Sequence, residues 1–161
     1  MPINYREMNA LTVKTVLIAG ILGGIWLFIM TFLGSNAGTM SAPYDIMTLG
    51  GMRDANDPII VLFFLYPFVL SFTSAVTFGM VRPALEGPDI YQGLRFGLVM
   101  ILLVMIPGLY VIYSSMTYPP GFFIGSLFTD LIGFPVLGIL YARIWSRMTG
   151  RTRAGPAVSP E

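Results

Sequence analysis

The sequence contains no cysteine and no histidine, and these two absences exclude most of the chemistry found at protein active sites. Without cysteine there are no disulfides, no thiolate nucleophile and no cysteine-ligated metal. Without histidine the chain cannot offer an imidazole to haem b, zinc or copper, or use one as a proton shuttle. Eleven methionines remain as soft ligands, but they are scattered through apolar segments, where lipid contact and packing are their expected roles. We therefore expect no cofactor and no bound metal.

Charged residues are also scarce, at 11% of the chain against about 25% in an ordinary soluble domain. Hydrophobic residues make up 55%, and they gather in four stretches, at about 15–34, 58–81, 96–115 and 120–142. A helix needs ~20 apolar residues to cross a hydrocarbon core ~30 Å thick. The sequence thus predicts an all-α integral membrane protein, a bundle of four transmembrane helices whose surroundings are the lipid bilayer, with no role for nucleic acid.

The domain organisation that follows has three parts. Residues 1–14 form a short N-terminal segment, residues 15–146 the transmembrane domain, and residues 147–161 a tail that is first basic and then of disordered composition. The first apolar stretch exceeds the ~7–15 residues of a signal-peptide core, so we expect it to be a retained span.

The cations indicate the orientation of the spans. With the N-terminus inside, only Arg53 lies on the outer side. Eight cations share the inner side: Arg6, Lys14, Arg82, Arg95, Arg143, Arg147, Arg151 and Arg153. Because loops that stay in the cytoplasm retain Lys and Arg, this asymmetry predicts a multi-pass protein with both termini cytoplasmic.

The connections differ in length. Residues 35–57 form the one long outer segment, and its Asp54, Asn56 and Asp57 fall short of a complete calcium-loop pattern, so a helix cap before Pro58 is favoured. The short inner connection at 83–92 predicts an antiparallel hairpin of the second and third spans. The tight turn at 118–120 predicts that the third and fourth spans are also neighbours.

Small residues spaced by four predict faces where helices approach closely, either within the chain or between subunits. The residues concerned are Gly20 with Gly24, Gly93 with Gly97, and Gly121, Gly125, Thr129 and Gly133 on the last span. One proline interrupts each of the last three spans, at Pro67, Pro107 and Pro135, and predicts a kink there.

Asp130 is the most informative single residue, because it falls about ten residues into the last span, near the bilayer midplane. A carboxylate at that depth costs at least ~2.5 kcal/mol. Its candidate partners within the chain are Tyr66, Ser71, Tyr110 and Thr129. Three roles remain open for Asp130: a hydrogen-bonded structural acid, a proton or cation site, or a contact with another subunit.

One set of residues in the second half of the chain carries a resemblance: Gly93, Gly97, Tyr110, Tyr113, Asp130, Gly133 and Gly138. In these positions it resembles small prokaryotic four-span membrane proteins whose families have no assigned function. The resemblance implies a four-span helical fold in a prokaryotic plasma membrane, and it implies no activity.

Small size, minimal loops, glycine-lined helices and the lack of paired catalytic carboxylates favour a non-catalytic role. We expect an accessory or assembly subunit of a larger membrane complex, in contact with other membrane subunits or with copies of itself. The alternative is a small proton- or cation-linked transporter or channel that uses Asp130. An enzyme ranks third, since Asp130, Glu86 and Asp89 form no obvious pair.

Overall fold

The computed structural model describes the backbone of residues 5–149 and the side chains of residues 12–149. The long helices of this part are α1 (Tyr5–Ser41), α2 (Val61–Val81), α3 (Asp89–Met100), α4 (Ile106–Ser115) and α5 (Pro120–Met148). Short helical turns stand between them, at η1 (Ile46–Thr48), η2 (Pro58–Ile60), η3 (Arg82–Ala84) and the π-helix η4 (Ile101–Met105). Four continuous helical segments are long and apolar enough to cross a membrane, namely Thr12–Ser41, Pro58–Ala84, Asp89–Ser115 and Pro120–Met148. The predicted all-helical chain with four such helices is confirmed.

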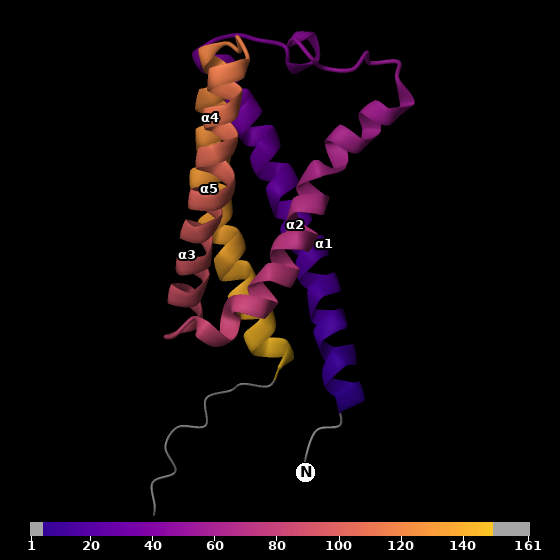
Figure 1. Ribbon diagram of the computed structural model, residues 1–161, viewed down its shortest axis with the longest axis vertical. Coiled ribbons are helices and arrows are strands. Elements are labelled where there is room, and N and C mark those ends of the chain that lie inside the picture. The colour runs from indigo at the N-terminus through magenta and orange to yellow at the C-terminus, as the bar shows by residue number, and fades with distance from the viewer. Residues whose placement is uncertain (1–4, 150–161) are drawn as a thin grey trace, which may run out of the picture.

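The central helix of the bundle is α5, which packs along both α1 and α3. In contrast, α2 packs along α1 and crosses it at an angle, so that the two form an X (Figure 1). Most described cations lie toward one end of the bundle, here called the basic end: Lys14, Arg82, Arg95, Arg143 and Arg147. The opposite end, here called the loop end, holds the connections 42–57 and 116–119. Among residues 12–149, Arg53 is its one cation.

Close packing of glycines extends α1 beyond the apolar stretch predicted to end at Gly34. The helix continues to Ser41, because Gly34 and Gly38 lie directly against the backbone of α5. A Cβ on Gly34 would lie 2.6 Å from the carbonyl oxygen of Gly125, closer than two such atoms can approach. The outer connection is therefore shorter than predicted, at residues 42–57. The predicted tail at 147–161 lies outside the described residues beyond Thr149.

The core is richest at the basic end, where four aromatic side chains from three helices meet. The ring of Phe78 on α2 lies 5.1 Å from that of Phe96 on α3 and 5.4 Å from that of Trp145 on α5, centre to centre. Tyr141 on α5 completes the cluster, 6.0 Å from Phe78. The predicted hairpin of α2 and α3 is thus closed at this end only; from here the two helices diverge toward the loop end (Figure 1).

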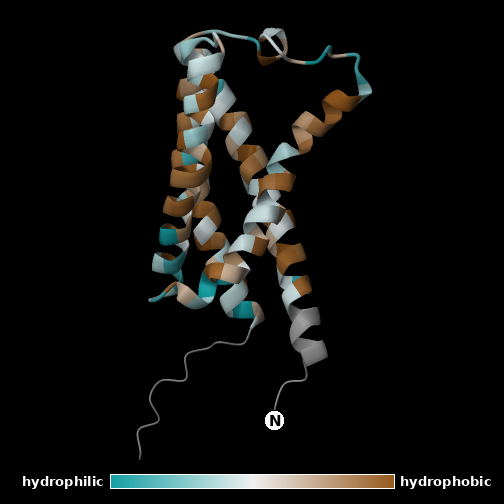
Figure 2. Cartoon of the chain, in the orientation of Figure 1, coloured by the Kyte–Doolittle hydropathy of each residue, from teal (hydrophilic) through white to brown (hydrophobic). Residues whose placement is uncertain are grey.

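The outer faces of the helices carry large apolar side chains along most of their length (Figure 2). Phe32 on α1 is 67% exposed and Leu103 in η4 is 71% exposed, and many similar residues accompany them. An apolar surface of this extent would be a liability in water, whereas in a bilayer it is the expected contact with lipid chains. The exposed surface therefore agrees with the spans found by length and hydropathy.

The three prolines predicted to kink their helices have different surroundings. Pro67 and Pro135 lie inside α2 and α5, whereas Pro107 is the second residue of α4, just after the π-helix η4. In η4 the amide of Ile106 donates to the carbonyl of Ile101, five residues back. Because Pro107 has no N–H, it cannot donate to the carbonyl of Leu103, and the wider π turn lies next to that missing bond. Beyond it, a groove of about 540 Å³ separates α4 from α5 and is lined by Tyr110, Tyr113 and Phe123.

Candidate functional site

A buried hydroxyl cluster joins three helices in the basic half of the bundle. The Oγ of Ser71 on α2 donates to the main-chain carbonyl of Gly20 on α1 at 2.9 Å. The phenol of Tyr141 on α5 donates to the main-chain carbonyl of Ser71 at 2.7 Å, and the two hydroxyl oxygens are 2.8 Å apart. Because no water reaches this position in a bilayer, these bonds hold α1, α2 and α5 in one fixed arrangement.

From this cluster toward the loop end, α2 diverges from the other helices (Figure 1). Phe72 and Phe68 pack over Gly20 and Gly24, which have room for the rings because they carry no Cβ. One turn nearer the loop end the contacts stop, and every residue from Val61 to Tyr66 is exposed, between 41% and 60% of its surface. The loop-end half of α2 is therefore an apolar surface that none of the described helices covers (Figure 1).

Asp130 lies on α5 near the middle of its length. It precedes the fully buried Leu137 by two helical turns, so the two side chains share a face of α5. Toward the basic end that face packs against α1 and α2, since Leu137 lies beside Gly23 and Tyr141 bonds Ser71. Toward the loop end α2 diverges from α5 (Figure 1). The Asp130 side chain is partly buried, and within residues 12–149 it makes no hydrogen bond and no ion pair.

The structure brings one of the four expected partners toward Asp130. Tyr66 on α2 lies close enough to Asp130 for the charge of the carboxyl to act on the phenol, but no hydrogen bond joins the two side chains. Ser71 is engaged in the hydroxyl cluster described above, and the Oγ1 of Thr129 donates to the main-chain carbonyl of Met30 at 3.1 Å. Tyr110 is 71% exposed and lies in the groove between α4 and α5.

The predicted packing glycines all lie at contacts between helices of this chain. Gly20 and Gly24 face α2, Gly93 and Gly97 face the backbone of α5 at Ile139 and Pro135, and Gly121 and Gly125 face α1 at Gly38 and Gly34. Gly133 is less constrained, since a Cβ there would lie 3.6 Å from the nearest atom of Leu27. The main-chain carbonyl of Gly133 accepts a hydrogen bond from the indole Nε1 of Trp26 at 3.0 Å.

Sequence reasoning missed several residues of this arrangement. Gly34 and Gly38 are spaced by four, the same signal used elsewhere, but Gly34 was the last residue of the predicted first span and Gly38 lay beyond it. Tyr141 and Trp26 gave no signal, because an aromatic residue in an apolar stretch looks the same whether its polar atom bonds another helix or faces a headgroup. Their roles depend on which helices are neighbours.

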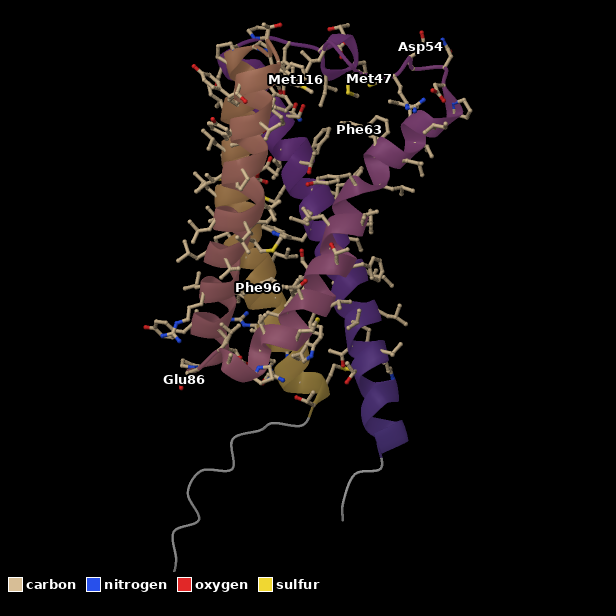
Figure 3. All side chains as sticks on the ribbon, viewed as in Figure 1. Met47, Asp54, Phe63, Glu86, Phe96 and Met116 are labelled. Atoms are coloured by element: carbon tan, nitrogen blue, oxygen red, sulfur yellow. The ribbon has the colours of Figure 1, made fainter. Side chains whose placement is uncertain are left out.

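Asp45 and Asp57 of the outer connection form helix caps, and the cap at Asp57 agrees with the favoured interpretation. Asp57 caps η2: its Oδ1 accepts from the amide of Ile59 at 2.9 Å, and its Oδ2 pairs with Arg53 at 2.7 Å. The Ile59 amide, followed by the Arg53 guanidinium, lowers the pKa of the Asp57 carboxyl below 3.8. Asp54 accepts from the amide of Asn56 at 2.8 Å, and Figure 3 shows Asp54 on the loop, away from the bundle.

Comparisons with known proteins add no relative: no family model, no curated protein and no solved structure matches this chain. The class that the structure itself defines is an all-helical protein with four helices suited to crossing a membrane. The likeness to small prokaryotic four-span proteins stays a prediction from sequence.

Proposed function

We propose that this chain is a non-catalytic subunit of a larger membrane complex, and that its partner binds at Asp130 and the loop-end half of α2. The observation that carries the proposal is the Asp130 carboxyl, placed at mid-helix without a hydrogen-bond or ion-pair partner among residues 12–149. Ionisable groups inside membranes pair with one another or face a polar cavity. The described cations of this chain lie toward the ends of the spans, so a partner has to come from elsewhere.

The shape of the same region supports a helix as that partner. Residues Val61 to Tyr66 form an apolar surface on one side of the divergence, and Asp130 lies within electrostatic range of it through Tyr66. A foreign helix carrying one donor side chain would cover the apolar residues and satisfy the carboxyl together. A polar contact of this kind also fixes the register of two helices.

The proposal includes the setting of the complex. The gathering of Lys14, Arg82, Arg95, Arg143 and Arg147 at the basic end supports a cytoplasmic position for that end and for both termini, in a prokaryotic plasma membrane. Arg53 and the capped loop would then face outward.

A small transporter or channel made of several copies of the chain is the second candidate, and the proximity of Asp130 and Tyr66 is the observation that favours it. Two titratable groups close together within the spans are the kind of arrangement that carries protons or cations in transporters. The two candidates differ in composition: one predicts unrelated chains in the complex, the other copies of this chain.

Site-specific photocrosslinking tests the proposal. We would place a photoreactive residue at Leu62, which is 60% exposed on the loop-end half of α2, and a matched one at Leu103, which is 71% exposed on the third span. The proposal expects a defined adduct with an unrelated membrane protein at Leu62 and only lipid or scattered adducts at Leu103. Native mass spectrometry of the complex extracted from its own membrane would then give the stoichiometry.

Two other outcomes are informative. Adducts between copies of the chain at Leu62, together with a pure homo-oligomer, would favour the transporter and make ion flux in liposomes the next measurement. A monomer that crosslinks only to lipid at both positions would contradict both candidates.

A further inference from the structure

The basic end contains a cavity that the proposed partner surface does not use. It has a volume of about 770 Å³ and lies between the end of α2, the start of α3 and the last turns of α5. This volume falls within the ~300–1,000 Å³ typical of small-molecule sites. The spans Pro58–Ala84, Asp89–Ser115 and Pro120–Met148 all begin or end here, which places the cavity at the level where lipid headgroups lie.

Side chains of both charges line this cavity. Arg82 and Arg143 contribute two guanidinium groups, and Glu86 and Asp89 contribute two carboxylates. The side chains of Glu86, Asp89 and Arg143 make no hydrogen bond or ion pair with any residue from 12 to 149. The carboxylates of Glu86 and Asp89 and the guanidinium of Arg143 therefore leave both signs of charge available to a ligand, while Arg82 also donates to the hydroxyl of Thr149 at 3.4 Å.

The uncharged side chain of Gln92 in the cavity wall also has a polar atom available to a ligand. Gln92 lines the cavity, and its Nε2 donates to the main-chain carbonyl of Gly87 at 2.8 Å. Its Oε1 is buried and accepts no hydrogen bond from the residues that the structure describes. Since buried acceptors normally receive a hydrogen bond, a ligand that donates one to the Oε1 of Gln92 would complete this wall of the cavity.

We propose that this cavity binds the headgroup of a zwitterionic phospholipid, a phosphodiester that carries a primary amine. The phosphate would be held by Arg82 and Arg143, with the hydroxyl of Ser146 as a further donor, and the ammonium by Glu86 and Asp89. Figure 3 shows Glu86 at the basic end beside the start of α3, and Figure 2 shows hydrophilic residues at the ends of α3 and α5 there. A purely anionic headgroup would meet the same two carboxylates and be repelled by them.

The test is a lipid competition on the delipidated full chain in mild detergent, read by native mass spectrometry. Dioleoyl phosphatidylethanolamine and dioleoyl phosphatidylglycerol, which share their acyl chains, are added in equal amounts. We expect one molecule bound per chain, with phosphatidylethanolamine preferred by about tenfold, the factor that one charge-assisted hydrogen bond is worth. Equal binding of the two lipids would overturn the proposal.

Two sets of variants assign the effect to the cavity. Arg143→Gln should weaken phosphatidylethanolamine binding by about tenfold, whereas Arg147→Gln, which removes the same charge one turn further along α5 and outside the cavity, should leave it unchanged. Glu86→Gln combined with Asp89→Asn should abolish the preference between the two lipids while binding persists. A loss of binding as large in Arg147→Gln as in Arg143→Gln would overturn the proposal.

One further experiment distinguishes a bound membrane lipid from a bound water-soluble phosphoester. Glycerophosphoethanolamine carries the same headgroup without acyl chains, and at equal concentration it should not displace the lipid. Displacement would show that the cavity takes a water-soluble phosphoester and would overturn the assignment to lipid. Circular dichroism of each variant verifies that the helices are retained, and failure here leaves the proposed partner surface at Asp130 untouched.

Discussion

Tyr141 and Ser71 hold α5 against α2 through their hydroxyl groups and one main-chain carbonyl. The Oη of Tyr141 lies 2.7 Å from the carbonyl oxygen of Ser71 and 2.8 Å from its Oγ, while the same Oγ lies 2.9 Å from the carbonyl oxygen of Gly20. The three short oxygen–oxygen contacts therefore share the two hydroxyl protons of Ser71 and Tyr141. This cluster marks the level at which α2 is held in the bundle, and beyond it α2 diverges.

Removing the phenol hydroxyl should loosen this junction. Tyr141→Phe is expected to lower the free energy of unfolding by about 1–2 kcal/mol, because a buried hydrogen bond between α5 and α2 is lost. The measurement is reversible unfolding in mixed detergent micelles. Tyr113→Phe is the control, since Tyr113 is 76% exposed and makes no hydrogen bond within residues 12–149. A loss as large in the control would contradict the role of the cluster.

Glycines that look alike in the sequence should respond differently to alanine. Gly125→Ala places a methyl group 2.5 Å from the carbonyl oxygen of Gly34, in a backbone that cannot yield easily. We expect a loss of about 1–3 kcal/mol in the free energy of unfolding, typical of overpacking. Gly133→Ala meets its nearest neighbour at 3.6 Å and should be tolerated. Equal stability of the two variants would show that α1 and α5 do not meet at Gly34 and Gly125.

In the isolated chain, the unpaired Asp130 carboxyl should lower the free energy of unfolding, and binding of the proposed partner should remove this loss. Asp130→Leu replaces a partly buried carboxyl without hydrogen bonds by an apolar group, and is expected to raise the free energy of unfolding of the purified chain by about 1–3 kcal/mol. The same variant should lose the proposed partner, whereas Asp130→Asn, which keeps hydrogen-bonding atoms, should retain it. Co-purification from the native membrane measures the second effect. Loss of stability in Asp130→Leu would mean that the carboxyl is already satisfied within the chain.

The cap at Asp57 should depend on pH. The folded pKa of this carboxyl is lowered by the Ile59 amide and Arg53, so its ionised form stabilises the start of the second span at neutral pH. That contribution is fully present above the unfolded pKa of 3.8 and is lost as the pH falls through the lower, folded pKa.

Hydrogen exchange at the Ile59 amide provides the measurement for this cap. Relative to the intrinsic rate, protection should fall only below about pH 4, where the carboxylate begins to be protonated. In Asp57→Asn, protection should be reduced at neutral pH and should no longer change between pH 5 and pH 2. A wild-type profile that does not change over this range would contradict the cap.

The sequence by itself determined the class of fold, because crossing a hydrocarbon layer requires an apolar run of fixed length, and that requirement is local. It also marked most of the glycines that allow close packing, since their spacing of four is a property of one helix. Asp130 could be singled out for the same reason: its cost arises from depth along one span. None of these inferences required knowledge of a neighbouring helix.

Only the tertiary structure decided which helices and which side chains are in contact. The extension of α1 to Ser41 depends on Gly34 and Gly38 meeting α5, and the role of Tyr141 depends on the position of Ser71. The divergence of α2 from α5 toward the loop end depends on how α1 and α5 pack together. Lipid chains are as apolar as the side chains they touch, so hydropathy ranks no pairing of helices above another; shape and a few buried hydrogen bonds decide, and both exist only once the chain has folded.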